Sequence, residues 1–182
     1  MDLIEKTVKE NIVYEGKILT LRRDDIELPN GKSATREFVV HTGGVCVAPL
    51  TDENELIFVK QFRYPYGKVI LELPAGKLEK GEDAFDAGVR ELEEETGLVA
   101  DKYYNCGVAY PSPGYTGESL YLYIAYGLHK THMHLDEDEF LEVVKIPVDE
   151  AVKMVMNDEI NDAKTQILVL KLSNLLKEGL LK

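Results

Sequence analysis

Apolar residues are interspersed with polar and charged ones along the first part of the chain, and a helical period replaces this pattern later. Apolar residues among charges in residues 17–28 predict a β-strand, and residues 35–41 are expected to form the return strand. Asn30 and Gly31 lie between these strands. Because both residues tolerate positive φ, they predict a tight hairpin turn. We therefore expect residues 1–41 to form antiparallel strands.

Further short apolar runs predict more strands. They comprise residues 45–50, 56–61, 69–73, 103–109, 120–127 and 140–146. The first two runs flank a polar segment, residues 51–55, and are expected to pair as a second hairpin. After residue 73 the sequence Pro74-Ala75-Gly76 interrupts the strand pattern.

A helix is predicted for residues 83–96, and Gly97 is a suitable residue to end it. One stripe of this helix carries Phe85, Gly88, Val89 and Leu92 at i, i+3, i+4 and i+7. Two more helices are expected, over residues 147–156 and 163–177. This order predicts an α/β (α+β) domain in which helices pack on a mixed sheet. Residues 42–182 would form that domain, and residues 1–41 a separate flap or dimerisation subdomain.

Composition narrows the function classes. The 182 residues suit one domain of ordinary size, with 45% apolar and 30% charged residues. The formal net charge of −12 repels nucleic-acid backbones, so a general DNA or RNA binder is not expected. A small anionic substrate would need a metal ion or local arginines to offset this field.

Neither a secretion signal nor a membrane span is expected. The first residues are charged where a signal needs an apolar run, and no stretch approaches the ~20 apolar residues of a membrane helix. The two cysteines, Cys46 and Cys106, lie far apart without a metal-binding or redox spacing. The simplest interpretation is a reduced, cytoplasmic protein.

A cluster of acidic residues makes the predicted 83–96 helix unusual. At ~100° per residue, Glu91, Glu94 and Glu95 fall on one flank of the apolar stripe, whereas Glu93 is expected to point toward solvent. Carboxylates at this spacing repel one another and oppose the helix dipole, each at a cost of tenths of a kcal/mol to about one. A divalent cation such as Mg²⁺ reverses both effects, because it requires clustered carboxylate oxygens.

The cluster alone has a simpler interpretation, a solvated acidic face in which Arg90 pairs with Glu93 or Glu94. The surrounding sequence favours the metal site. The pattern G-x5-E-x7-R-E-U-x-E-E-x-G-U, where U is aliphatic, is matched by Gly76, Glu82, Arg90, Glu91, Leu92, Glu94, Glu95, Gly97 and Leu98. This segment resembles the Nudix hydrolase box at every specified position.

The resemblance implies a mixed sheet sandwiched between helices, and hydrolysis of a nucleoside diphosphate linked to another group. It implies that Glu91, Glu94 and Glu95 bind the metal with the carbonyl of Ala75, and that Glu94 and Glu95 are catalytic. Mg²⁺ is the expected ion, with Mn²⁺ as a substitute. Metal ions suit this chemistry because they neutralise the diphosphate and lower the pKa of water.

The resemblance also implies structural roles for other positions of the box. Glu82 and Arg90 would hold the loop and helix together as an ion pair, and Gly76 would allow a sharp turn in the loop.

A second motif narrows the branch of the family. The turn-rich loop of residues 110–118 places Pro113 sixteen residues after Gly97, within Ser-Pro-Gly-x-x-x-Glu. This loop resembles that of the ADP-ribose pyrophosphatases. Supporting segments are residues 27–31, 60–63, 72–76, 135–140 and 162–165. The resemblance implies that ADP-ribose is hydrolysed to AMP and ribose 5-phosphate, by a homodimer in which the N-terminal strands of one subunit complete the other's substrate site.

Four further residues are assigned within this scheme. Glu118, on the loop, is the candidate general base, because a loop carboxylate can approach the attacking water. Arg36 and Arg63 are candidate phosphate ligands, since the guanidinium group binds phosphate bidentately. Glu72 is a candidate for a further acid near the metals.

Several alternatives remain open at this stage. The substrate could be another nucleoside diphosphate sugar, such as GDP-mannose or an ADP-sugar. The protein could also be a ligand sensor without activity, or a Ca²⁺-binding module, although it lacks an EF-hand loop. His129, His132 and His134 do not have the spacing of a zinc site and are expected in a polar loop. The acidic run of residues 136–139 is expected to be a solvated loop.

Overall fold

The computed structural model describes residues 3–135 and 139–181, and the contacts within the chain divide it into two compact units. The N-terminal unit comprises Met1–Gly43 together with Tyr110–Ser119. The sandwich unit comprises Gly44–Ala109 and Leu120–Lys182. The loop that carries Glu118 therefore belongs with the N-terminal strands, although the segments on either side of it belong to the sandwich unit.

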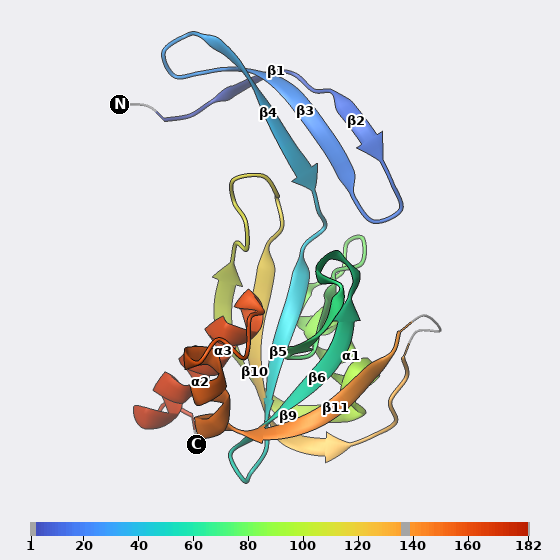
Figure 1. Ribbon diagram of the computed structural model, residues 1–182, viewed down its shortest axis with the longest axis vertical. Helices are drawn as coiled ribbons and strands as arrows, with labels where there is room; N and C mark the ends of the chain where they lie inside the picture. The colour runs from blue at the N-terminus through green and yellow to red at the C-terminus, as the bar shows by residue number, and fades with distance from the viewer. Residues whose placement is uncertain (1–2, 136–138, 182) are drawn as a thin grey trace. The chain divides into compact units, whose positions relative to one another are not determined.

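An antiparallel sheet forms the N-terminal unit (Figure 1). Among the described residues it has four strands, β1 (Lys6–Lys9), β2 (Ile12–Glu15), β3 (Thr20–Glu27) and β4 (Ser33–Val40). β4 pairs with β3 along its whole length, and β1 and β2 pair with different halves of β3. The predicted hairpin is confirmed: Gly31 has a φ of 78°, and the Leu28 N–H donates to the Lys32 carbonyl at 2.8 Å.

Backbone hydrogen bonds attach the 110–119 loop to the end of β4. The Val39 N–H donates to the Tyr115 carbonyl at 2.8 Å, and the Gly117 N–H donates to the Val39 carbonyl at 3.0 Å. A parallel bridge between Val39 and Thr116 results. The loop is thereby held as an extension of the sheet.

The outer strands of the N-terminal unit and the segments next to them carry many exposed apolar side chains. They include Leu3, Ile4, Val8, Ile12, Val13, Tyr14, Ile18 and Leu19. Few side chains of this unit are buried, Ile26 among them. An apolar surface of this kind on a small sheet is typical of an interaction surface.

A second sheet forms the centre of the sandwich unit. Seven strands of the described chain compose it: β5 (Gly44–Leu50), β6 (Glu55–Arg63), β7 (Lys68–Glu72), β8 (Ala75–Lys77), β9 (Leu98–Ala109), β10 (Leu120–Lys130) and β11 (Leu141–Pro147). β5 is buried along its whole length and pairs with β10 in parallel and with β8 in antiparallel orientation. β6 pairs with β7 and β11, and a short 3-10 helix, η1 (Tyr64–Tyr66), follows it.

Helices cover both faces of this sheet (Figure 1). α1 (Ala84–Thr96) packs through Ala87 and Leu92 on Val45 and Val47 of β5. α2 (Val148–Met156) and α3 (Ala163–Lys177) pack on the opposite face. That face presents Cys46, Ala48, Leu122 and Ile124. Alternate residues of β5 thus contact different helices, as the pleat of a strand requires. The predicted sheet between helices is confirmed.

Two predictions about strands were wrong in part. The second hairpin is reduced to one pair, Leu50 with Leu56, because β5 uses its edges to pair with β8 and β10. The predicted break at residues 74–76 is limited to its first position, because the chain leaves β7 at Glu72 and forms β8 from Ala75 onward, where β5 offers hydrogen-bonding partners. The helix boundaries, by contrast, are close to those predicted. No helix within the described ranges is both long and apolar enough to cross a membrane.

Candidate active site

Both ends of α1 are fixed by local signals in the sequence. The Asp83 side chain caps the first turn by accepting a hydrogen bond from the Phe85 N–H at 2.8 Å. Gly97 ends the helix with a φ of 64°, and its N–H donates to the Glu93 carbonyl. These caps set the position of the acidic last turn.

The three predicted metal ligands lie on α1 in different environments. Glu91 and Glu95 are buried, with 9% and 2% of their surfaces exposed, whereas Glu94 is partly exposed. Glu93 does not point freely into solvent as predicted, because it is half-buried and accepts a hydrogen bond from Thr131 Oγ1 at 3.0 Å. Two carboxylates are therefore withdrawn from water, which is costly unless a partner compensates for it.

β8 brings the loop before α1 against these carboxylates. The Ala75 N–H donates to Glu95 Oε2 at 3.0 Å. Gly76 lies so close to Glu91 that a Cβ there would stand 1.8 Å from Glu91 Oε1. The prediction that Gly76 allows a sharp turn was wrong: its φ is not positive, and the absence of a side chain makes room for Glu91 instead.

Arg90 joins the box into one unit. Its Nε and Nη2 donate to the two oxygens of Glu82 at 2.9 and 3.1 Å, which confirms the predicted ion pair. Its Nη1 donates to Glu91 Oε1 and Glu94 Oε2, both at 2.8 Å. The Glu79 N–H also donates to Glu82, at 2.8 Å. One guanidinium group thus links the loop to two of the predicted ligands.

Burial dominates the electrostatics of the acidic turn. It raises the pKa of Glu95 to about 8, while the hydrogen bond from Ala75 acts in the opposite direction. Burial also raises the pKa of Glu91, against the effect of Arg90. The charge of Glu139 adds to both shifts. Removing water from carboxylates on one flank of a helix creates a strong demand for positive charge.

The residues of this turn fit a hard divalent cation. Carboxylate oxygens from Glu91, Glu94 and Glu95 are the donors that Mg²⁺ and Mn²⁺ prefer. As the side chains are placed, no three His, Cys, Asp or Glu groups of the described residues converge into a metal cluster. Arg90 contacts Glu91 and Glu94, and Glu95 is bonded to the backbone of Ala75.

Arg63, the last residue of β6, is held by Glu72. Its Nε and Nη2 donate to the two carboxylate oxygens at 2.6 and 2.7 Å, and Lys164 Nζ lies 2.5 Å from the same carboxylate. Burial alone would raise the pKa of Glu72, but Arg63 and Lys164 hold it below its usual range. The carboxylate predicted as a further acid near the metals is thus engaged by two cations.

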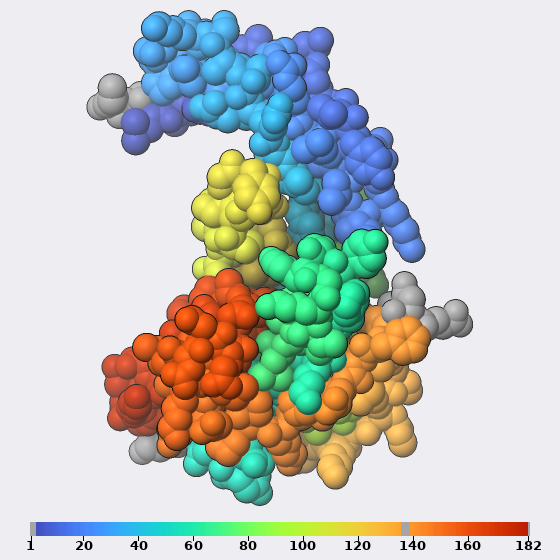
Figure 2. Space-filling model, viewed as in Figure 1, coloured from blue at the N-terminus to red at the C-terminus, as the bar shows by residue number. Residues whose placement is uncertain are grey.

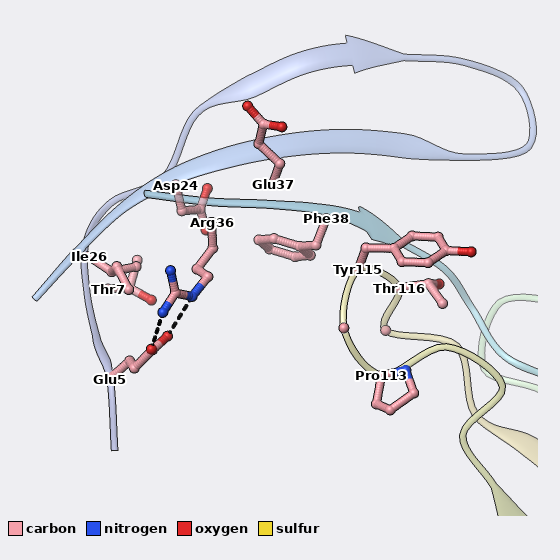
Figure 3. A pocket seen from close by; sticks show the side chains of 12 residues that line it. Glu5, Thr7, Asp24, Ile26, Arg36, Glu37, Phe38, Pro113, Tyr115 and Thr116 are labelled. Atoms are coloured by element: carbon pink, nitrogen blue, oxygen red, sulfur yellow. Dashed lines mark hydrogen bonds and ion pairs between the residues drawn. The ribbon is translucent and has the colours of Figure 1, made fainter. Parts of the chain in front are cut away.

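Arg36, in β4, lines a hollow of the N-terminal unit. The hollow, of about 470 Å³, lies between the strands and the 110–119 loop and is also lined by Phe38, Pro113 and Tyr115. Figure 2 shows this hollow between the blue strands and the yellow loop. The guanidinium of Arg36 is paired with Glu5, with Nε at 2.9 Å from Oε2 (Figure 3).

Glu118 also belongs to the N-terminal unit. Its N–H donates to Thr116 Oγ1 at 3.2 Å, and its carboxylate lies 3.8 Å from His41 Nδ1. The same nitrogen accepts a hydrogen bond from the Gly43 N–H at 3.0 Å. The role of Glu118 as general base stays a prediction.

Glu139 belongs to the acidic run that the sequence predicts to be a solvated loop. Residues 136–138 of the acidic run lie outside the described residues, but Glu139 is half-buried and close enough to Glu91 and Glu95 to raise the pKa of each. The sequence did not single out Glu139, because every acidic residue in a run of like charges could equally face solvent.

The three histidines expected in a polar loop make other contacts in the described chain. His129 Nε2 pairs with Asp101 at 2.9 Å, and the rings of His132 and His134 stack edge to face at 6.4 Å.

Comparison with known proteins supports these observations. The NUDIX domain matches residues 40–168, and the nucleoside diphosphate sugar hydrolase N-terminal domain matches residues 5–39. The ADP-ribose pyrophosphatase of Bacillus subtilis (strain 168) is 44% identical, covering 98% of this chain and 96% of that protein. The methanol dehydrogenase activator of Bacillus methanolicus is also 44% identical, over 91% and 90% of the two chains.

A more distant relative and a solved structure agree with this. The ADP-ribose pyrophosphatase of Mycobacterium tuberculosis (strain ATCC 25618 / H37Rv) is 34% identical, over 85% of this chain and 76% of that protein. The crystal structure of an ADP compounds hydrolase superposes with a TM-score of 0.84 and covers 100% of both chains at 21% identity, which shows the shared fold.

Proposed function

The chain belongs to the Nudix hydrolase family, and from this premise we propose that it hydrolyses ADP-ribose to AMP and ribose 5-phosphate. One observation carries the proposal. The buried acidic turn of α1, with its Ala75 and Gly76 loop, occurs in a chain that matches an ADP-ribose pyrophosphatase over nearly its full length.

Mg²⁺ is the proposed ion, with Mn²⁺ as a substitute. Glu91, Glu94 and Glu95 would hold it together with the carbonyl of Ala75. A bound divalent cation would neutralise the diphosphate and favour deprotonation of the attacking water. Arg90 supports this arrangement because it anchors the loop to the helix and keeps Glu91 and Glu94 in place. With a net charge of −12, local positive charge is needed to admit an anionic substrate.

Arginine side chains would bind the diphosphate of the substrate. The guanidinium group of Arg63 is already oriented by Glu72. Less side-chain entropy of Arg63 would therefore be lost when it binds a phosphate. Arg36 stays a second candidate. In the N-terminal unit it lines a hollow with Phe38 and Tyr115, and aromatic rings of this kind are suited to flat or apolar parts of a ligand.

Two carboxylates are candidates for the general base. Glu118 is proposed from the loop motif, and Glu139 from its electrostatic influence on Glu91 and Glu95. A base needs only to be ionised near neutral pH and within reach of the attacking water. The two candidates belong to separate units of the chain, so substitution of each can separate them.

We further propose a homodimer assembled through the strands of residues 1–41, whose apolar side chains are exposed. Cytoplasmic location is proposed from the free thiols of Cys46 and Cys106, both of which are buried. Neither proposal is needed for the chemistry of the acidic turn.

The substrate is the part of the proposal that most needs an experiment. Phosphate-coupled turnover of ADP-ribose with Mg²⁺ would be compared with turnover of GDP-mannose, ADP-glucose and NADH. We expect ADP-ribose to give the highest kcat/KM, and Glu95→Gln to remove most of the activity. A preference for GDP-mannose or ADP-glucose would replace the substrate but keep the chemistry. No turnover with any divalent ion would favour a ligand sensor.

A further inference from the structure

The carboxylate of Glu72 is enclosed by positive charge at the end of β7. Only 2% of the residue is exposed, and both oxygens accept hydrogen bonds from Arg63. Lys164, whose side chain is 12% exposed, contacts Oε2 from α3. A buried ion pair contributes little net stability compared with apolar residues of the same size. The cluster therefore invites a functional explanation.

The first turn of α3 ties this cluster to the backbone. Lys164 Nζ lies 2.9 Å from Asp162 Oδ1, and the other oxygen of Asp162 accepts hydrogen bonds from the N–H and hydroxyl of Thr165. Thr165 Oγ1 in turn accepts the Leu73 N–H at 2.9 Å. Leu73, which follows Glu72 and precedes Ala75 by two positions, is thus hydrogen-bonded to α3.

The cluster lies next to the loop that contacts the acidic turn, because Glu72 is three positions before Ala75, whose N–H donates to Glu95 Oε2. Arg63 uses Nε and Nη2 on Glu72, and within residues 3–135 and 139–181 its Nη1 makes no hydrogen bond. Burial raises the pKa of Glu95, and Arg63 is close enough for its charge to oppose that rise. The remaining arm of Arg63 is therefore available for a ligand near Glu95.

We propose that Glu72 is a positioning residue: held by Lys164, it fixes the guanidinium of Arg63 so that Nη1 can bind a phosphate of the substrate. This inference rests on the proposed function, because it assumes a diphosphate substrate at the acidic turn. Glu72 does not touch the substrate. It acts through Arg63, and Lys164 balances its charge so that the carboxylate stays ionised although it is buried.

The direction in which Glu72→Gln changes the affinity for the diphosphate distinguishes a positioning role from a general electrostatic role. Glu72→Gln removes a negative charge close to an anionic ligand. If charge alone mattered, the variant would bind the diphosphate more tightly. If Glu72 positions Arg63, the variant binds it more weakly, because the guanidinium loses its bidentate partner.

The experiment measures binding of the non-hydrolysable α,β-methylene ADP-ribose with Mg²⁺ by calorimetry, together with KM and kcat for ADP-ribose. We expect Glu72→Gln to raise Kd and KM by roughly tenfold or more, as for loss of a charge-assisted hydrogen bond, with a smaller change in kcat. When Arg63 is already replaced by Ala, Glu72→Gln should cause little further increase in Kd or KM. The proposal would be overturned if Glu72→Gln bound the analogue as tightly as the wild type or more tightly. It would also be overturned if the increases in Kd caused by Glu72→Gln and Arg63→Ala multiplied in the double variant.

Two further variants keep the result interpretable. Glu72→Gln with Lys164→Met removes both buried charges, and it should remain folded in a thermal melt while still showing the binding defect. Lys60→Met with Glu142→Gln removes an exposed pair, 3.1 Å apart, that involves the same strand β6, and it should leave Kd unchanged. A folded double variant that binds like the wild type would refute positioning.

A substrate-free measurement separates this proposal from the proposed function. In nitrogen–proton correlation spectra, the Arg63 Nε–H should be protected from exchange in the wild type and lose that protection in Glu72→Gln. Equal protection in both proteins would contradict the positioning role. If the wild type binds no diphosphate but the signal changes as expected, the proposed function fails while the Glu72–Arg63 coupling stands.

Discussion

Gly76 and Glu91 are packed so closely that a single methyl group on Gly76 would overlap the Glu91 carboxylate, with only 1.8 Å between Cβ and Oε1. The contact is made by the end of a side chain that can rotate, whereas the loop and helix around it are fixed by Arg90 and by the Ala75–Glu95 hydrogen bond. The glycine therefore determines where the Glu91 carboxylate lies.

Gly76→Ala should reduce activity far more than stability. Glu91 can turn away from the new methyl group at a small cost in folding free energy, but it then leaves its position as a metal ligand. We expect kcat/KM to fall roughly 10- to 100-fold, the usual effect of displacing a group that orients a metal site. Gly114→Ala is the matched control, because a Cβ there meets nothing within 4 Å. Equal activity of both variants would disprove the packing argument.

Arg90→Lys should destabilise the protein, and most strongly without divalent metal. Lysine keeps the charge but not the fork that bonds Glu82, Glu91 and Glu94. We expect a loss of about 1–3 kcal/mol in urea unfolding with a chelator present, and a smaller loss with Mg²⁺, which would take over part of the compensation.

The control for this substitution is Arg23→Lys. Arg23 and Glu37 form an exposed pair at 3.9 Å, so we expect a loss under about 0.5 kcal/mol. If Arg90→Lys were as mild as this control, the charges of the acidic turn would not depend on the geometry of Arg90.

Local signals explain why the sequence predicted the helices and the box so closely. Asp83 and Gly97 mark the ends of α1 through capping, which depends only on neighbouring residues. The Glu82–Arg90 pair was foreseen only through family resemblance, since its partners lie eight positions apart across a loop. The resemblance to the Nudix box thus predicted the Glu82–Arg90 contact, which the hydrophobic periodicity alone does not predict.

Pairing between strands and side chains far apart in the chain could not be predicted from the sequence, for a physical reason. The pairing of β5 with β10 and β8, which leaves only Leu50 to pair with β6, depends on segments distant in the chain. The engagement of Glu72 by Lys164 likewise joins residues 92 positions apart. Strand propensity and charge pattern are properties of local windows, so they do not specify such partners.

Mg²⁺ should stabilise the protein more at alkaline than at acidic pH. Burial raises the pKa of Glu95 to about 8 from its usual value of 4.5. The folded state therefore holds a proton that the unfolded state releases as pH rises from about 4.5 to 8, and the metal-free protein loses stability across this window. We expect the rise in Tm caused by Mg²⁺ to be larger at pH 8.5 than at pH 5.5.

Glu95→Gln provides the control for that pH dependence. Glutamine carries no titrating proton, so the metal-free variant should lose less stability between pH 5.5 and 8.5 than the wild type. A wild-type protein whose metal-free Tm rose across this range would show that other groups dominate the titration.

Substitution of Glu118 and Glu139 should identify the general base. Either Glu→Gln variant keeps the shape of the side chain but removes its ability to accept a proton. We expect the true base to lose roughly 10²- to 10⁴-fold in kcat with little change in KM, and the other variant to change kcat only slightly. The pH profile of kcat would be measured for both. Small losses in both variants would contradict each assignment.

Val13→Asp should dissociate the proposed dimer. Val13 lies on β2 and is 59% exposed in the isolated chain, within the apolar surface formed by the outer strands. An interface that buries this side chain would have to bury an unpaired carboxylate in the variant, which is strongly unfavourable. Sedimentation of the wild type should give a dimer and that of Val13→Asp a monomer. Val108→Asp, at a 47% exposed valine of β9, should leave the mass unchanged. A dimer that survives Val13→Asp would place the interface elsewhere.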